Sequence, residues 1–214
     1  MARKPKKSKT QRFYDRIANV HNLMMKVNGY QNSIAKLLRS LDLNLDKNSL
    51  VLDAGSGTGI VTLGFYGAGF RPRKTFAVDL SFNLLKISRE QFETNQQTDG
   101  NNICVVQGDV LKLPFADETF DLVLSCGVLE YVSVEKGLKE FARVLKKGSK
   151  LVLIPVRPSL VGSILEKLYN FKTNSVEETK QVAERCFEIT GIHKFPFTEP
   201  IGWSKMIFLL KKKF

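Results

Sequence analysis

The chain has 214 residues, of which 43% are hydrophobic and 25% are charged, as is ordinary for one globular domain with a sizeable core. Its longest apolar runs, such as LVLIPV at residues 151–156, fall far short of the roughly 18 to 20 residues that span a bilayer. The composition therefore argues against a transmembrane protein. No apolar signal region follows the basic start MARKPKKSKT, so we expect a cytoplasmic protein.

The net charge of +12 is concentrated at the two ends of the chain. Residues 1–12 carry six Lys or Arg and no acid, residues 205–214 carry four and no acid, and the remaining 23 basic residues face 21 acids. Such ends could contact an anionic membrane surface, RNA or acidic proteins, or they could be solvated and disordered. Charge alone therefore identifies no partner.

The three cysteines, Cys104, Cys126 and Cys186, are widely spaced and form no CxxC pair. This spacing indicates neither a zinc site nor a redox site. We expect buried free thiols and no bound metal.

Apolar spacing predicts helices first and then alternating strands and helices. Two helices are expected within residues 13–41, with a break between them at Asn28-Gly29. A buried strand then precedes the glycine cluster that starts at Gly55. The later predicted elements are a helix at 60–70, a strand at 76–80, a helix at 82–95 capped by Ser81, strands at 103–109 and 120–127, a helix at 134–146 and a strand at 150–156.

Five apolar strands alternating with helices predict an α/β fold, with a parallel sheet covered by helices on both faces. After Pro158, helices are expected at 159–171 and 176–187, followed by a hairpin of two strands in HKFPFTEP and WSKMIFLLKKK. We expect a basic tail and one domain in four parts. These are the tail (1–12), a helical lid (13–48), a core (49–156), a substrate-side insertion (157–191) and a C-terminal hairpin (192–214).

The stretch VLDAGSGTG at residues 51–59 places an acid two positions before three glycines. Gly55, Gly57 and Gly59 depart from the dinucleotide pattern G-x-G-x-x-G, because the last glycine comes one residue early. Asp53 would repel a pyrophosphate but suits a ligand with an amine or another cation. S-adenosylmethionine has an ammonium, a sulfonium and no phosphate.

From about residue 49 to residue 156 the chain resembles class I S-adenosylmethionine-dependent methyltransferases. Four segments agree with the motifs of that family in order and spacing: VLDAGSGTG, AVDLS, QGDVLKLPF and FDLVLSCGVLEYV. The resemblance implies a Rossmann-like sheet of seven mostly parallel strands, with the last strand antiparallel and a helical N-terminal lid. It also implies that Asp79 takes the ribose hydroxyls, while Asp109 accepts from the adenine amino group and Val110 offers its backbone.

Structural roles would also explain these acids, since Asp79 could cap a helix and Asp109 could stabilise a turn. The predicted cofactor site comprises Tyr14, Asp53, Gly55, Ser56, Gly57, Asp79, Leu80, Asp109, Val110 and Ser125.

Methyl transfer is an in-line displacement that needs alignment of donor and acceptor, and a base only where the acceptor must lose a proton. The sequence lacks the [DNS]-PP-[YFW] motif of adenine amine methylation, since Ser125-Cys126-Gly127-Val128 stands there. It also lacks the Pro-Cys of cytosine-5 methyltransferases. Nucleic acid is therefore a less favoured acceptor.

The segment RFYDRIANVHNLMM resembles the start of ubiquinone and menaquinone biosynthesis C-methyltransferases. This likeness implies that Tyr14 closes over the methionine end of the donor, although ordinary packing would explain it equally. His21 and Tyr131 are the candidate protonatable groups near the acceptor, with a surface or core role as the alternative for His21. Glu130 could line the site or cap a loop, and His193 is expected to be structural.

We therefore expect methyl transfer from S-adenosylmethionine to a small or lipid-like acceptor. The apolar face of residues 159–171 could roof a pocket or pack on the sheet, and with the basic ends it would suit peripheral contact with a membrane. Two alternatives stay open: an RNA or protein methyltransferase that uses the basic tails, and a protein that binds the cofactor without catalysis.

Overall fold

The computed structural model describes residues 28–98, 100–169 and 171–213, which form a seven-stranded sheet in the order β3-β2-β1-β4-β5-β7-β6. Neighbours from β3 to β5 pair in parallel, whereas β7 is antiparallel to both β5 and β6. The predicted fold, with its antiparallel last strand, is confirmed. The strands are β1 (Leu50–Ala54), β2 (Lys74–Asp79), β3 (Ile103–Gln107), β4 (Phe120–Cys126), β5 (Leu145–Ile154), β6 (Phe187–Lys194) and β7 (Met206–Lys212).

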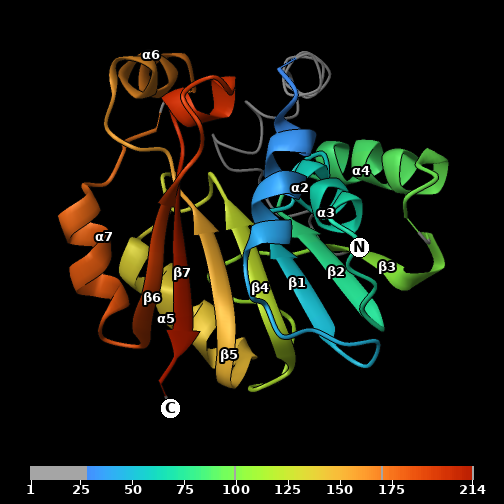
Figure 1. The fold of residues 1–214 in the computed structure, drawn as a ribbon. Coiled ribbons are helices and arrows are strands. Elements are labelled where there is room, and N and C mark those ends of the chain that lie inside the picture. The colour runs from blue at the N-terminus through green and yellow to red at the C-terminus, as the bar shows by residue number, and fades with distance from the viewer. Residues whose placement is uncertain (1–27, 99, 170, 214) are drawn as a thin grey trace, which may run out of the picture.

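Helices cover both faces of the sheet, as the apolar strands require. Figure 1 shows α2 and α3 in front of the sheet and α5 behind it. The helices are α2 (Tyr30–Ser40), α3 (Ile60–Gly67), α4 (Phe82–Thr94), α5 (Val134–Val144), α6 (Leu160–Tyr169) and α7 (Val176–Ala183), with 3-10 turns at Gly100–Asn102 and Pro200–Trp203.

The hydrophobic core consists of two clusters, one on each face of the sheet. On β4, Val123 packs in the cluster that includes Phe141 of α5, whereas Leu122 and Leu124 pack in the cluster that includes Ile34 of α2. Successive side chains of a strand point to opposite faces, so each central strand supplies both clusters. The sheet is thus fixed from both sides, and the loops at its carboxyl edge have a rigid base.

Local signals set several boundaries where the sequence predicts them. Gly29 has φ +66° and precedes the first residue of α2, at the predicted break. The Ser81 hydroxyl accepts from the Leu84 backbone at 3.3 Å and caps α4. Helix α3 ends three residues earlier than predicted, at Gly67, because Gly69 adopts φ +99° and the chain leaves the helix there.

The C-terminal third differs from the prediction in two places. Strand β5 begins at Leu145, before Gly148, and its register against β4 shifts between Phe120 and Leu122. Strand β6 begins at Phe187, which the sequence assigns to a helix, and most of HKFPFTEP is a loop. Because β6 is an edge strand with mostly exposed or half-buried residues, it lacks the apolar run that marks the central strands.

The cysteines are less buried than the sequence predicts. The three thiols are free, but Cys104, Cys126 and Cys186 are each half-buried rather than buried. Among the described residues, no helix combines the length and apolar character needed to cross a bilayer.

Candidate cofactor and acceptor site

A cavity of about 350 Å³ opens where the parallel strands end. This edge is where open α/β sheets bind ligands, because loops from neighbouring strands converge there. We call the part lined by loops after β1, β2 and β3 the glycine side, with Gly55, Gly57, Asp79 and Asp109. The other part, formed by the start of α2, the end of β4 with the loop after it, and the segment before β7, is the lysine side. Its lining residues are Tyr30, Cys126, Gly127, Tyr131 and Lys205.

The glycine turn is tied to the neighbouring strand by its backbone. The N–H groups of Gly55 and Ser56 donate to the Val78 carbonyl at 2.8 and 2.9 Å. Gly55 has φ +74°, and a Cβ there would lie 2.0 Å from Cγ2 of Val128. Only glycine fits this position, because both the dihedral and the close approach exclude a side chain.

Asp79 joins two loops at the rim of the cavity. Its Oδ2 accepts from the Gly57 backbone at 2.9 Å and its Oδ1 accepts from the Ser81 backbone at 2.8 Å. A carboxylate has about four acceptor positions, so it can still receive hydroxyl donors of a ligand. Asp79 therefore has the structural role that the sequence left open as an alternative, and it also lines the cavity.

Asp53 does not line the cavity as the sequence suggests. Its carboxylate is fully buried, and its Oδ2 accepts from the Thr62 backbone at 3.1 Å and from the Thr62 hydroxyl at 2.6 Å. Burial raises the pKa of Asp53 to about 7, against the effect of the Thr62 hydrogen bonds, and the charge of Asp79 adds to the rise. Asp53 holds the start of α3 beneath the turn.

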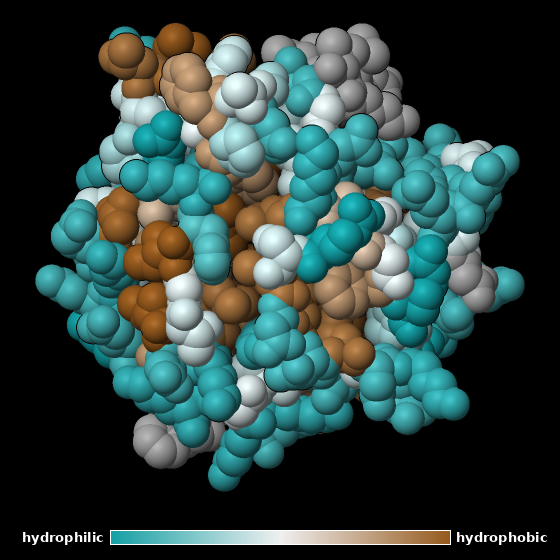
Figure 2. All heavy atoms as spheres, in the orientation of Figure 1, coloured by the Kyte–Doolittle hydropathy of each residue, from teal (hydrophilic) through white to brown (hydrophobic). Residues whose placement is uncertain are grey.

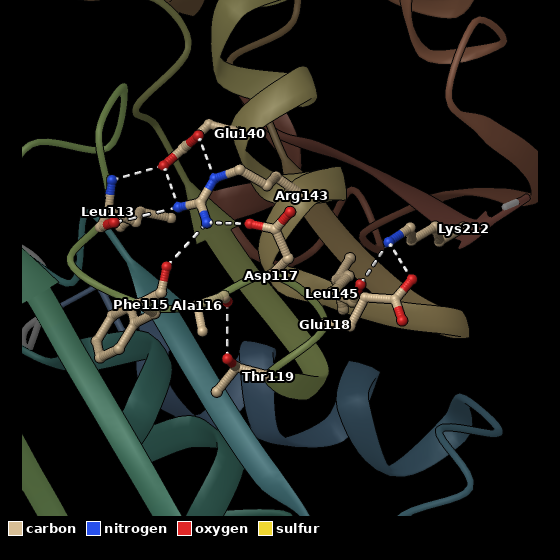
Figure 3. Close-up of polar contacts among 10 residues, drawn as sticks. All are labelled: Leu113, Phe115, Ala116, Asp117, Glu118, Thr119, Glu140, Arg143, Leu145 and Lys212. Carbon is tan, nitrogen blue, oxygen red and sulfur yellow. Dashed lines mark hydrogen bonds and ion pairs between the residues drawn. The ribbon is translucent and has the colours of Figure 1, made fainter.

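The loop after β3 is fastened by one arginine. Arg143 of α5 donates to the carbonyls of Leu113 and Phe115 and forms ion pairs with Asp117 and Glu140 (Figure 3). Hydrogen bonds from Arg143 lower the pKa of Glu140.

This loop begins with Asp109 and Val110, both of which line the cavity, and Asp109 Oδ1 accepts from the Leu111 backbone at 2.9 Å. The network thus holds the loop whose first residues form part of the site. Sequence reasoning gave no role to Arg143, because three of its five hydrogen bonds go to a loop 26 to 30 residues away in the chain.

Of the remaining predicted cofactor residues, Ser56 and Leu80 line the cavity, but Ser125 does not. Ser125 is fully buried, and its hydroxyl donates to the Ala54 carbonyl at 3.0 Å, which joins β4 to β1. Tyr131 does line the cavity, and its ring centroid lies 5.4 Å from that of Phe171. Tyr14 and His21 lie outside the described residues.

Four further residues can be placed relative to the cavity. Tyr30 and Lys205 line the cavity and were not predicted, since neither lies in a recognisable motif. Glu130 is buried below the cavity wall, where its carboxylate accepts from the Val156 backbone. His193 is exposed on β6, away from the lining residues.

The geometry of the glycine side fits S-adenosylmethionine. Gly57 has φ +55°, and a Cβ there would meet no atom within 4 Å, so the turn leaves open space beside the Asp79 carboxylate. Leu80, Leu84 and Val110 add apolar walls. These features fit a ligand with hydroxyl donors and a flat apolar base. No cluster of three or more metal-ligating side chains occurs in residues 28–98, 100–169 and 171–213.

Comparison with known proteins agrees with this geometry. The methyltransferase domain family matches residues 52–153. An uncharacterized protein of Methanocaldococcus jannaschii is 35% identical over 163 residues, covering 76% of this chain and 62% of that protein. A demethylmenaquinone methyltransferase of Thermobifida fusca is 38% identical over 115 residues, covering 51% of this chain and 46% of that enzyme. The chain thus spans between about half and two thirds of the length of these relatives.

Solved structures share the fold at low identity. A possible histamine N-methyltransferase of Thermotoga maritima has a TM-score of 0.75 at 21% identity, over 95% of this chain and all of that one. Geranyl diphosphate C-methyltransferase of Streptomyces coelicolor, solved with S-adenosylhomocysteine, has a TM-score of 0.69 at 15% identity, over 83% and 74%. The [4+2]-cyclase SpnF has a TM-score of 0.76 at 15% identity, over 98% and 97%.

The sheet order and the cavity at its carboxyl edge define a class I Rossmann-like methyltransferase fold. Residues 52–153 carry a methyltransferase domain, and the sheet that contains them has the fold of class I S-adenosylmethionine-dependent methyltransferases.

Proposed function

We propose that the protein transfers a methyl group from S-adenosylmethionine to a small or lipid-like acceptor. The observation that carries this proposal is that one continuous cavity joins a glycine side suited to the donor with a lysine side that leaves room for an acceptor. When bound, S-adenosylmethionine would supply an electrophilic methyl whose sulfonium leaves as a neutral thioether.

The glycine side would hold the donor by named groups. Asp79 would accept from the ribose hydroxyls, and Asp109 and Val110 would recognise the adenine edge. Charge-assisted hydrogen bonds to a carboxylate are about twice as strong as neutral ones, so Asp79 would contribute most. Asp53 would act indirectly, by holding the turn.

The lysine side favours an acceptor with an apolar body. Tyr30 and Tyr131 line it, and Phe171 packs against Tyr131. Helix α6 lies just before Phe171 in the chain, and its residues Leu160 and Ile164 are 88% and 64% exposed. Figure 2 shows a hydrophobic surface over α6. An exposed apolar helix near a site suits a lipid-like molecule. The name of the Thermobifida fusca relative supports this class, whereas an RNA or protein acceptor gains no comparable support.

Calorimetry with purified protein tests the donor site. We expect S-adenosylmethionine and S-adenosylhomocysteine to bind in the micromolar range, and Asp79→Ala to weaken both by about 1 to 3 kcal/mol through lost hydrogen bonds. Glu177→Ala, on the exposed first turn of α7, should change neither affinity. No binding heat with either ligand would refute the methyltransferase proposal.

The acceptor class can be found with a labelled methyl group. The protein is incubated with methyl-labelled S-adenosylmethionine and a cell extract, which is then divided into lipid, small polar, RNA and protein fractions. We expect the label in the lipid or small polar fraction. Label in RNA or protein would favour the alternative acceptors, and binding without any transfer would favour a non-catalytic protein.

A further inference from the structure

We propose that Lys205 forms an anion-binding subsite on the lysine side, which receives a negatively charged oxygen of the acceptor. The proposal rests on the proposed function and narrows its acceptor to molecules that carry a carboxylate, a phosphate or an ionised hydroxyl group.

The backbone places the lysine firmly. Lys205 follows the 3-10 turn Pro200–Trp203 and directly precedes β7, and its N–H donates to the Ile201 carbonyl at 2.9 Å. It also forms an isolated antiparallel bridge with Val156, next to the end of β5. The side chain therefore starts from a fixed point at the sheet edge and not from a free loop.

The ammonium lies within the cavity wall. Lys205 is only 7% exposed yet lines the cavity. A Cβ at Gly127 would lie 2.8 Å from Nζ of Lys205, so the glycine after β4 provides the space that the ammonium occupies. Burying an ammonium is unfavourable unless it is paired or hydrogen-bonded, so such a group calls for a partner.

The described residues supply that partner only in part. No carboxylate oxygen of residues 28–98, 100–169 and 171–213 is recorded within 4.0 Å of Nζ of Lys205. Glu130 is near enough to act through its charge, but one of its oxygens receives the Val156 N–H and the other has no hydrogen-bond partner among these residues.

Two other neighbours of the ammonium are Tyr30 and Cys126, and Cys126 is a thiol whose pKa is raised by burial, so it offers a weak acceptor without full charge. Burial lowers the pKa of Lys205, but its interactions with Cys126, Glu130 and Tyr30 raise it, and the net pKa lies above its ordinary value. The ammonium thus keeps its proton. With three donors and few acceptors, it can bind an oxygen from the cavity.

Electrostatics also specifies the charge of the acceptor. The donor carries a sulfonium cation in the same cavity, and two cations in a site of low dielectric repel each other. A negatively charged oxygen beside Lys205 would attract both the ammonium and the sulfonium and so reduce this repulsion. Without it, the ammonium should disfavour S-adenosylmethionine relative to S-adenosylhomocysteine, which lacks the sulfonium charge.

Three probes distinguish which anionic group the subsite binds. They are 4-nitrophenol for an ionised hydroxyl, benzoate for a carboxylate and inorganic phosphate for a phosphate. Each is titrated into the S-adenosylhomocysteine complex of the wild type, Lys205→Met, Lys205→Gln and the control Lys86→Met on the exposed face of α4. We expect at least one probe to bind the wild type and the control, and both Lys205 variants to bind it at least tenfold more weakly. Bound 4-nitrophenol should ionise at a lower pH in the wild type than free in solution, as seen in its absorbance.

A second readout needs no acceptor. Lys205→Met should tighten S-adenosylmethionine relative to S-adenosylhomocysteine by several-fold, while thermal unfolding shows that the variant is folded. The subsite would be overturned if all three probes failed to bind the wild-type complex, or if both Lys205 variants bound the probes as tightly as the wild type. Failure of the wild type to bind S-adenosylhomocysteine at all would instead overturn the proposed function.

Discussion

The two sides of the cavity are built in different ways. The glycine side consists of three short turns, each directly after a strand, and backbone N–H groups of the first two donate to the carboxylate of Asp79. The lysine side joins Tyr30, Tyr131 and Lys205, which lie at least 74 residues apart along the chain and meet only in the folded sheet. The first is set by local turn chemistry, and the second depends on packing of the whole domain.

The largest expected effect concerns Asp53, which supports the glycine side from below. Its pKa of about 7 in the folded protein exceeds the 3.8 of an ordinary Asp. The folded state therefore binds the proton more tightly than the unfolded state, and its stability falls as pH rises from about 4 to about 7. Above pH 7, the ionised Asp53 carboxylate lowers the free energy of unfolding by roughly 4 kcal/mol relative to low pH.

Asp53→Asn removes this titration. Relative to the wild type, we expect the variant to gain free energy of unfolding as the pH is raised from 4 to 8, as measured by urea unfolding at each pH. Asp121→Asn, a half-buried acid paired with Lys146, serves as the control. A difference between wild type and Asp53→Asn that does not vary with pH would contradict the assigned pKa.

The next effect separates stability from binding within the glycine turn. Gly55→Ala brings a Cβ against Val128 at φ +74°, and we expect it to lower the free energy of unfolding by about 3 kcal/mol. Gly57→Ala also has a positive φ but meets no protein atom, so we expect a smaller loss of stability, about 1 kcal/mol. Its cofactor affinity should nevertheless fall tenfold or more.

Urea unfolding and calorimetry with S-adenosylhomocysteine measure both quantities for both variants. Normal affinity in Gly57→Ala would show that the open space beside this residue is not the donor site.

The Arg143 network gives a smaller effect that reaches the site through a loop. Arg143→Met removes the donors to Leu113 and Phe115 and leaves Glu140 without its cation. We expect a loss of about 2 kcal/mol in the free energy of unfolding. Cofactor affinity should also fall a few-fold, because the loop carries Asp109.

Arg185→Met is the matched control, since its pair with Glu135 is exposed on both sides and should contribute little. Equal stability of the two variants in urea would show that the Arg143 contacts do not fix the loop.

Sequence alone predicted most of the glycine side. Gly55, Asp79 and Asp109 stand at fixed distances after apolar strands, so their proximity follows from the parallel sheet. The direction of a carboxylate does not follow from such spacing, and Asp53 therefore points at Thr62 and not into the cavity. Lys205 carries no local signal, because its neighbours Cys126 and Glu130 come from another part of the chain.

The smallest expected change in stability tests the surface beside the lysine side. In α6, Leu160 and Ile164 are 88% and 64% exposed, so replacing both by Ser should change the free energy of unfolding by no more than about 0.5 kcal/mol. If α6 receives a lipid-like acceptor at a membrane surface, the double variant should cosediment several-fold less with anionic phosphatidylglycerol vesicles. Ile192→Ser, at an exposed apolar residue of the edge strand β6, should pellet like the wild type.

Vesicle pelleting at low and moderate salt separates the apolar contribution from the basic ends, because salt screens charge and leaves apolar contacts intact. The α6 effect should persist at moderate salt, whereas attraction by the basic residues 1–12 should weaken. Equal pelleting of the wild type and the double variant at both salt concentrations would mean that α6 packs or binds something other than a membrane. The acceptor would then have to reach the lysine side from solution, where only the polar groups around Lys205 and the aromatic rings would select it.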